Sequence, residues 1–385
     1  MPYFSFSLKQ NFFDKNKIIY DFSKIQADTT FFSKNTFLWK KLNNKKNKKY
    51  INFIKFERRT KVKLVKGSIL FCLPPSIGLG DAIEYGIALN TICSNKNYIN
   101  SAVVFTGKYI SIFQKYFDLK KVYGDIISLK EMSKYDMIFH LSLEIKELKY
   151  QKYIRNDIED VIVNYFKVNK KRICEKPIHQ LVKKINIFPV SQSPIRSMPP
   201  ILVDKIIESF QEDYEINIIF DKSSSISSYI EDNIKSVNFK KFSPRSLDDL
   251  CNIINNTEFG IFMDSGPLHV AKLLGVRGVL ITTSVGGNVL LNKFSTIKEI
   301  TNSFYSNFCK SPCGLTNLIN FQNNIGCYES LEISKRNIIE SENLNALQRG
   351  LIKNKYINFM KNPVGCIKNI NVDTIIKKIH EYIKN

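Results

Sequence analysis

Apolar runs of strand length alternate with helical segments in the first part of the chain. Three such runs lie at residues 68–73, 101–106 and 136–143. Two segments whose apolar residues recur at helical spacing lie between them, at residues 81–95 and 109–117. Strands and helices that alternate over short connections form a parallel sheet covered by helices on both faces. The pattern therefore predicts an open α/β domain.

The same pattern starts again near residue 185. Strands are predicted at residues 185–190, 216–221, 259–263 and 278–282, with helices at 201–211, 247–257 and 268–275. A loop rich in Ser and Pro, residues 191–200, follows the first of these strands. Two successive α/β units predict two Rossmann-like domains that face each other across a cleft, joined near residues 165–184. We assign residues 67–178 to the first domain and residues 179–385 to the second.

Residues 1–66 have aromatic and basic character without this alternation, and we expect an N-terminal extension or small subdomain there. They contain 17 Lys and Arg against 4 Asp and Glu, a net charge of +13 within a total of +22. Most of the excess lies in residues 40–66. A solvated Lys-rich arm and a surface for an anionic membrane or phosphorylated partner both stay open. Nucleic acid is not expected as a partner, because no RNA-binding signature or zinc-finger spacing is present.

Length and hydropathy narrow the class of protein further. The 385 residues suffice for two or three domains, and 44% of them are hydrophobic, as in folded proteins. No apolar run reaches the roughly 18–20 residues that span a bilayer. The first residues lack the basic and apolar blocks of a secretory signal. We therefore expect a cytoplasmic protein, with a peripheral position at the inner face of the membrane as the alternative.

Residues 264–269, Asp-Ser-Gly-Pro-Leu-His, stand where a buried strand ends and a helix begins. Gly266 lets a ligand approach the backbone closely, and the proline after it suits the first turn of a helix. The N-terminus of such a helix offers N–H groups and a positive dipole end to an anion, which predicts a diphosphate site. Ser265 and His269 can add hydrogen bonds, whereas Asp264 suits sugar hydroxyls better. The alternative is that Asp264 or Ser265 caps the helix and His269 is a core residue.

Three segments of the chain resemble glycosyltransferase family 9, the heptosyltransferase-like enzymes. Residues 263–281 (MDSGPLHVAKLLGVRGVLI) are similar to its donor-binding motif, with Arg277 where the family usually has proline. Residues 74–89 (PPSIGLGDAIEYGIAL) are similar to its N-terminal loop, and residues 187–200 (IFPVSQSPIRSMPP) to its strand-to-loop segment. The resemblance spans residues 67–385. It implies a GT-B architecture of two Rossmann-like domains and catalysis without a divalent metal.

Transfer from a nucleotide sugar needs a base for the acceptor hydroxyl and a group that stabilises the departing diphosphate. Asp81 follows Gly78 and Gly80 at the end of the first strand, so we expect this acceptor loop to face the cleft with Asp81 as the base. The resemblance implies the same role. The alternative is an aspartate that stabilises the start of its own helix.

Arg196 is predicted to clamp the diphosphate together with Ser191 and Ser193. A guanidinium can grip two phosphate oxygens at once. The resembling family often has lysine at this place, so arginine changes the geometry and keeps the charge. The alternative is an arginine on a solvated loop.

Four cysteines occur late in the chain, namely Cys309, Cys313, Cys327 and Cys366. Four thiolates suit a tetrahedral site for zinc or iron, although the spacing is not that of a zinc finger. The autotransporter heptosyltransferases, which belong to the resembling superfamily, carry a four-cysteine iron site in this part of the chain. We expect a structural iron or zinc that holds an insert of residues 305–366 to the second domain. Free buried thiols and disulfides are the alternatives.

The residues and the resemblance together predict an inverting enzyme of hexosyl or heptosyl transfer. The donor is expected to be a nucleotide-diphospho-sugar, with ADP-heptose among the candidates, and the acceptor a hydroxyl of a glycan, lipid or protein. No cofactor is expected for catalysis. Residues 40–66 would hold the enzyme near an anionic membrane or engage an acidic acceptor. The alternative from another class is a non-catalytic scaffold of the same fold that binds a nucleotide sugar or glycan.

Overall fold

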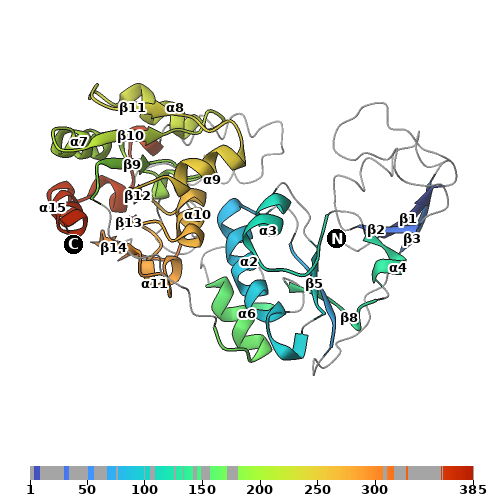
Figure 1. The fold of residues 1–385 in the computed structure, drawn as a ribbon. Coiled ribbons are helices and arrows are strands. Elements are labelled where there is room, and N and C mark those ends of the chain that lie inside the picture. Colours follow the sequence, from blue (N-terminus) through green and yellow to red (C-terminus); the bar gives the residue numbers. More distant parts are fainter. Residues whose placement is uncertain are drawn as a thin grey trace. The chain divides into compact units, whose positions relative to one another are not determined.

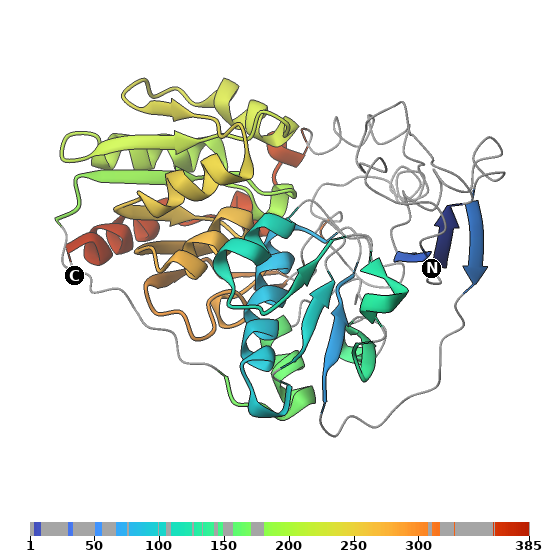
Figure 2. The same cartoon turned by 45° about the vertical axis from the view of Figure 1, so that its right-hand side comes forward.

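The computed structural model divides the chain into two compact units. Unit 1 comprises Met1–Tyr150 and Ile158–Lys171, and unit 2 comprises Gln151–Asp157 and Arg172–Asn385. The structure describes residues 4–8, 30–33, 51–55, 67–74, 77–98, 100–104, 109–124, 127–132, 134–141, 145–148, 157–170, 181–306, 310–315, 327, 357 and 359–384. In this part of the chain, no helix is both long enough and apolar enough to cross a membrane. The two units are drawn in Figures 1 and 2 and are described separately below.

Unit 1 contains a parallel four-stranded sheet with the order β6-β5-β4-β8. Its strands are β4 (Ile69–Cys72), β5 (Ala102–Val104), β6 (Val122–Tyr123) and β8 (Met137–His140). In chain order the sheet reads 3-2-1-4, so the first and fourth strands are neighbours. Cys72 at the end of β4 is paired with His140 at the end of β8. The strand order therefore reverses between these two residues.

Helices cover both faces of this sheet. They are α2 (Leu79–Cys93), η3 (Lys96–Tyr98), α3 (Ile110–Tyr116), α4 (Leu129–Met132), η4 (Lys146–Leu148) and α6 (Ile158–Phe166). Phe166 of α6 packs against Phe71 and Phe139, with ring centroids 5.4 and 5.2 Å apart. Leu70 and Met132 belong to a separate buried cluster, on the other face. The alternation of side chains along β4 thus gives each face its own packing layer.

The N-terminal residues form strands rather than an α/β unit. They are β1 (Phe4–Leu8), β2 (Thr30–Ser33) and β3 (Ile51–Lys55), and β7 (Ile127–Ser128) joins them. The order in this antiparallel sheet is β3-β1-β2-β7. The sheet therefore links the N-terminal extension to the segment between β6 and β8 in unit 1.

Unit 2 is built on a parallel six-stranded sheet with the order β11-β10-β9-β12-β13-β14. Its strands are β9 (Lys184–Phe188), β10 (Glu215–Ile219), β11 (Lys240–Phe242), β12 (Phe259–Phe262), β13 (Gly278–Thr282) and β14 (Ile297–Thr301). In chain order this sheet reads 3-2-1-4-5-6, the order of a dinucleotide-binding Rossmann sheet. The predicted fold class of two Rossmann-like α/β units is confirmed. The exact domain limits stay a prediction.

Helices lie on both faces of the unit 2 sheet (Figure 1). They are η5 (Pro194–Arg196), α7 (Pro200–Phe210), α8 (Ser225–Asn233), α9 (Leu247–Asn255), α10 (Gly266–Leu274), α11 (Gly287–Leu290), α14 (Gly365–Lys368) and α15 (Val372–Lys384). A small antiparallel pair, β15 (Phe304–Tyr305) and β16 (Lys310–Ser311), follows the sheet.

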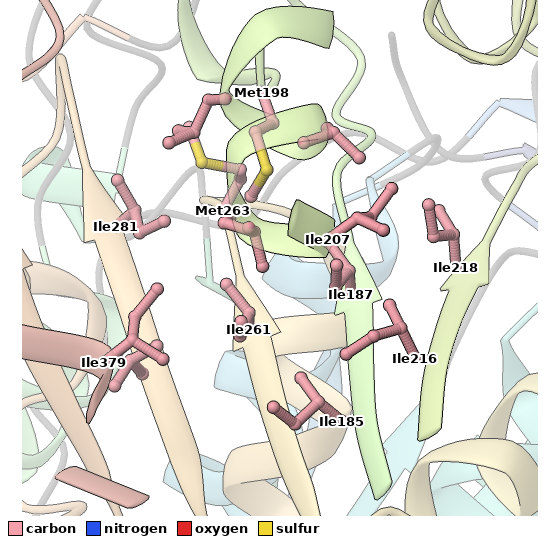
Figure 3. Close-up of a cluster of buried hydrophobic side chains, with 14 of the residues drawn as sticks. Ile185, Ile187, Met198, Ile207, Ile216, Ile218, Ile261, Met263, Ile281 and Ile379 are labelled. Carbon is pink, nitrogen blue, oxygen red and sulfur yellow. The ribbon is translucent and has the colours of Figure 1, made fainter. Parts of the chain in front are cut away.

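Isoleucines from neighbouring strands form the core on the face covered by α7, α8 and α15. Ile187, Ile216 and Ile261 belong to one buried cluster with Ile207 of α7 and Ile379 of α15 (Figure 3). Each of these side chains is buried. Burying an isoleucine contributes about 1.5–3 kcal/mol, so this layer stabilises unit 2 substantially.

The opposite face carries a short row of buried polar side chains. The Nδ2 amide of Asn217 in β10 donates to Oδ1 of Asn186 in β9, at 2.9 Å. The Nδ2 amide of Asn186 in turn donates to the Thr257 hydroxyl, at 2.7 Å. Asn186 and Asn217 are partners in the strand register.

Arg277, where the resembling family has proline, fastens the C-terminal helix. Its guanidinium donates to the backbone carbonyls of Tyr382 and Ile383, at 2.7 and 2.9 Å. These carbonyls lie in the last turn of α15, where the helix has no donors of its own for them. A proline at position 277 could not make either bond, so this departure has a structural consequence.

Candidate functional site

The predicted donor-binding residues lie at the carboxyl ends of adjacent strands in unit 2. Ser191–Arg196 follow β9, and Asp264–Gly266 follow β12, its neighbour in the sheet. The strand order reverses between β9 and β12. Ligands of open α/β sheets bind outside the carboxyl ends of the strands at such a reversal. The fold thus brings segments about 70 residues apart in sequence to the edge where binding is expected.

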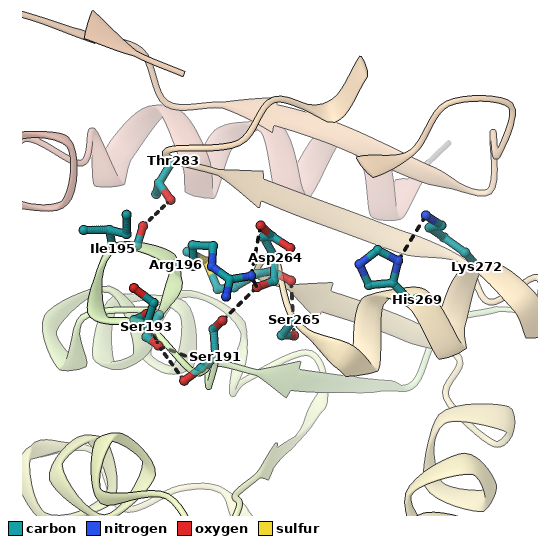
Figure 4. Close-up of polar contacts among 11 residues, drawn as sticks. Ser191, Ser193, Ile195, Arg196, Asp264, Ser265, His269, Lys272 and Thr283 are labelled. Carbon is teal, nitrogen blue, oxygen red and sulfur yellow. Dashed lines mark hydrogen bonds and ion pairs between the residues drawn. The ribbon is translucent and has the colours of Figure 1, made fainter. Parts of the chain in front are cut away.

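Arg196 and Asp264 form a nearly buried ion pair at this edge (Figure 4). The Arg196 Nη1 atom lies 3.2 Å from Oδ2 of Asp264, and the side chains are 12% and 4% exposed. The same Nη1 donates to the backbone carbonyl of Asp264, at 3.1 Å. Arg196 is therefore not on a solvated loop. Its guanidinium is held by Asp264, so a phosphate group would have to share it or displace the carboxylate.

Hydroxyl groups organise the loop after β9. The Ser191 hydroxyl donates to the Asp264 carbonyl at 2.9 Å. The Ser197 hydroxyl accepts from the Ser191 amide at 3.0 Å and donates to the Ser193 carbonyl at 3.0 Å. The buried hydroxyl of Ser193 has no hydrogen-bond partner among the described residues. Ser191 thus has a structural contact, whereas the Ser193 hydroxyl has none among the described residues.

Helix α10 begins as the sequence predicts, with Ser265 in the capping position and proline in the first turn. Its start at Gly266 is two residues earlier than expected. The Ser265 hydroxyl makes no bond to the first turn of the helix and instead donates to the Met263 carbonyl, at 3.3 Å. The first N–H groups of a helix have no partner within the helix, so those of α10 need another acceptor.

His269 and Lys272 lie together inside the unit, one turn apart on α10. The Lys272 Nζ atom is 3.3 Å from Nδ1 of His269 and also donates to the Leu290 carbonyl. The side chains of His269 and Lys272 are 1% and 3% exposed. The sequence predicts that His269 adds a hydrogen bond to the diphosphate, and it indicates no role for Lys272. Their spacing of three residues on one helix was the signal that would have linked them.

The loop after β13 completes this edge of the sheet, and none of the predicted site residues lies in it. The Thr283 hydroxyl donates to the Ile195 carbonyl at 2.6 Å, which ties the loop to the segment that carries Arg196. The Ser284 hydroxyl is buried and has no hydrogen-bond partner among the described residues. The backbone carbonyl of Ser284 accepts from the amides of Cys313 and Gly314. Two buried hydroxyls without a hydrogen-bond partner among the described residues, those of Ser193 and Ser284, therefore belong to the loops at this edge.

Asp81 occupies the first turn of α2 in unit 1, after the carboxyl end of β4. Gly78 is the capping residue of α2, and Gly80 lies in its first turn. A Cβ atom built on Gly78 would lie 3.7 Å from Oδ2 of Asp81, so the carboxylate leans over the start of its own helix. This placement is compatible both with the predicted base and with the alternative, stabilisation of the helix start. The role of Asp81 stays a prediction.

Buried polar groups accompany Asp81 at this end of the unit 1 sheet. Tyr85 lies one turn further along α2, and burial together with the charges of Asp81 and Glu84 raises its pKa strongly. His140 ends β8, the neighbour of β4, and burial lowers its pKa to about 3. His140 is therefore neutral at physiological pH. It lies at the reversal of strand order in unit 1, the place where ligands of such sheets bind.

The late cysteines lie partly within the described residues. Cys313, Cys327 and Cys366 share an apolar cluster with Ile195, the residue next to Arg196. Cys309 lies outside the described residues. Among the residues that are described, no three metal-binding side chains lie close enough together to hold an ion. The four-cysteine site stays a prediction, because one of its four members lies outside the described residues.

The sequence matches no protein-family model and no curated protein. Several solved structures are similar in fold. One is the heptosyltransferase TibC of enterotoxigenic E. coli H10407, an iron-containing dodecamer, with 12% identity and a TM-score of 0.45 over 93% of this chain and 92% of that one. Another is the ADP-heptose lipopolysaccharide heptosyltransferase II of E. coli, with 11% identity and a TM-score of 0.44 over 62% and 91%.

A third is a glycosyl transferase from Veillonella parvula, with 13% identity and a TM-score of 0.43 over 60% of this chain and 85% of that one. It belongs to family 9, the family that the sequence motifs resemble.

Proposed function

We propose that the chain is a glycosyltransferase that takes its sugar from a nucleotide-diphospho-sugar. One observation carries this proposal: the reversal of strand order between β9 and β12 brings Arg196, Ser193 and the N-terminus of α10 to one edge of the sheet. A guanidinium, hydroxyl groups and the amides of a helix start are the groups that proteins use for diphosphates. The motifs of the sequence support the same proposal.

In the proposed site, the carboxylate of Asp264 competes with a phosphate group for the Arg196 guanidinium. The carboxylate and carbonyl of Asp264 both contact the Arg196 guanidinium. A diphosphate would take over part of the guanidinium, since a phosphate carries more charge than a carboxylate and offers more acceptor oxygens. The carboxylate of Asp264 would then be available to the hydroxyls of the sugar.

The acceptor side belongs to unit 1 in this proposal. Asp81 would take the proton of the acceptor hydroxyl as the sugar is transferred with inversion. A glycan, a lipid and a protein hydroxyl are all acceptors that such chemistry permits. Residues 40–66 would bind an anionic membrane or an acidic acceptor, and they lie almost entirely outside the described residues. The transfer chemistry itself needs no metal.

The proposal is tested by incubating the full chain with a panel of nucleotide-diphospho-sugars and detecting nucleotide release and transferred sugar by mass spectrometry. We expect turnover of at least one donor. In titrations with ADP, GDP and UDP, Arg196→Ala should weaken binding of the preferred nucleotide at least about tenfold, the loss expected for a charge-assisted contact. Arg245→Ala, at an exposed arginine before α9, serves as the matched control.

The outcome separates the enzyme from the scaffold. Binding of a nucleotide sugar without turnover of any donor or acceptor would favour the non-catalytic alternative. Unchanged nucleotide affinity in the Arg196 variant would mean that the diphosphate does not bind at this edge of unit 2. A thermal unfolding curve of each variant confirms that the protein is folded during the titration.

A further inference from the structure

Lys272 is a buried cation that the proposed transfer chemistry leaves unexplained. Its side chain is 3% exposed, and lysine is almost never buried to this degree without a specific partner. It lies on α10, the helix whose N-terminus borders the proposed diphosphate site. Unlike a surface lysine, Lys272 therefore needs partners within the fold for its ammonium group.

The Lys272 Nζ atom contacts groups from α10, α11 and the residues just after α11. It donates to the Leu290 carbonyl of α11, and it lies 5.1 Å from the ring centroid of Phe294. The third group is Nδ1 of His269, at 3.3 Å. A carbonyl oxygen and the face of an aromatic ring both attract a positive charge. Both are therefore contacts that an ammonium group makes, since it has three N–H donors and no acceptor.

The contact with Lys272 determines which nitrogen of His269 carries its proton. A protonated Lys272 can only donate, so Nδ1 of His269 would accept from it and the imidazole proton would reside on Nε2. A second proton on the ring would place two positive charges 3.3 Å apart in a poorly solvated place, which is unfavourable. In Figure 4 the Nε2 side of the ring faces Asp264 and Ser265, the residues before α10.

We propose that Lys272 is a positioning residue for the nucleotide-diphospho-sugar, because its ammonium holds His269 as the neutral Nε2–H tautomer and directs that donor toward the diphosphate site. The ammonium also polarises the imidazole, so Nε2–H donates more strongly to an anion than an isolated imidazole does. This inference rests on the proposed function for the identity of the ligand. The tautomer itself depends on the contacts within α10 and α11 alone.

The tautomer is tested first, by NMR of the full chain labelled with ¹⁵N-histidine. The chain has four histidines, and the His269→Gln variant identifies the signals of His269. We expect the nitrogen shifts of an Nε2–H tautomer in the wild type and a mixture of tautomers in Lys272→Met. An Nδ1–H tautomer in the wild type, or an unaltered pattern in the variant, would overturn the proposal. The wild-type spectrum is decisive even where the variant folds poorly.

Nucleotide binding is tested second, by calorimetric titration of ADP, GDP and UDP. Lys272→Met should weaken the preferred nucleoside diphosphate about tenfold, the loss of one charge-assisted hydrogen bond. Lys377→Met, the same change at an exposed lysine of α15, should leave the affinity unaltered. Equal affinity of wild type and Lys272→Met would refute the positioning role. If the wild type binds none of the three nucleotides, the proposed function fails, and the NMR result still decides the tautomer.

Discussion

The ion pair of Arg196 and Asp264 holds both side chains in place, and its burial requires two charges to leave water. Taking two charged side chains out of water is unfavourable, and their attraction repays the loss only when both partners are present. The Ser191 hydroxyl and the Arg196 guanidinium additionally hold the Asp264 carbonyl. The pair keeps the guanidinium in place without a ligand, so a diphosphate would meet a donor whose orientation is already restricted.

Asp264→Asn should have opposite effects on stability and on nucleotide affinity. The variant keeps the shape of the side chain and removes the negative charge that pairs with the Arg196 guanidinium. We expect the free energy of unfolding to fall by about 3 kcal/mol, the lower end for breaking a buried pair. Nucleoside diphosphates should bind more tightly, because the carboxylate no longer competes. Chemical unfolding and calorimetry measure the two quantities, and a weaker affinity would contradict the competition.

Some of the site could be predicted at the level of single residues, and some could not. The start of α10 was predictable because serine, glycine and proline each have a local preference at a helix start. The pair of Arg196 with Asp264 was not, because it joins residues far apart in sequence through the strand order. The contact of Lys272 with His269 was within reach of the helical spacing, but the burial of a lysine is decided by tertiary packing.

At the scale of elements, Glu131 connects α4 to β6 in unit 1. Its carboxylate accepts from Lys121 at 2.6 Å and from the Tyr123 hydroxyl at 2.8 Å, and it also pairs with Lys134. These hydrogen bonds, that of Lys121 first, lower the pKa of Glu131 to about 2. The Tyr123 and Tyr135 hydroxyls lie 3.1 Å apart, which extends the same network.

The Glu131 network should stabilise unit 1 in a pH-dependent manner. The pKa of Glu131 is lower in the folded chain than its ordinary value of 4.5, so the stabilisation is complete above that value. It is lost as the pH falls from 4.5 toward about 2. Glu131→Gln should therefore lower the unfolding temperature at neutral pH and make less difference in acid. Thermal unfolding over a pH series checks this, with the exposed Glu212→Gln as control; a constant difference at every pH would contradict it.

Long apolar elements were predictable and short polar ones were not. The strand at residues 278–282 was predicted with the limits that the structure shows, because four apolar or β-branched residues follow Gly278. β6 has two residues, too few for any periodicity. β11 reads Lys-Lys-Phe and is exposed, so its pairing with β10 depends on the neighbouring strand rather than on its own sequence. β1–β3 could not be predicted from residues 1–66, which lack strand–helix alternation, because their pairing joins segments far apart in the sequence.

At the scale of the whole molecule, the proposed chemistry is divided between two units that fold around separate cores. Asp81 belongs to unit 1, whereas Arg196 and α10 belong to unit 2. A change at Asp81 should therefore leave the diphosphate site as it is. The two steps of the proposed reaction, binding of the donor and proton removal from the acceptor, become separable by mutation.

Asp81→Asn should lower the rate of sugar transfer by about 10²–10⁴-fold, the usual contribution of a general base. The affinity for the nucleotide should stay that of the wild type, because the proposed donor-binding residues belong to unit 2. Turnover assays and nucleotide titrations on the same preparation measure both. Full activity in the variant would assign Asp81 to the alternative role at the start of α2, for which a loss of thermal stability would then be the signature.

The row of Asn217, Asn186 and Thr257 has a consequence for how the sheet of unit 2 aligns during folding. Isoleucines alternate along β9 and β10, so sliding one strand past the other by two residues would keep the apolar side chains on the same face. Such misaligned states would be nearly degenerate with the native one if apolar packing alone distinguished them. Sliding by two residues separates the two asparagines and strands their amides in the interior, at about 1–3 kcal/mol for each unsatisfied group. A pair of amides thereby selects a single alignment from a repetitive sequence.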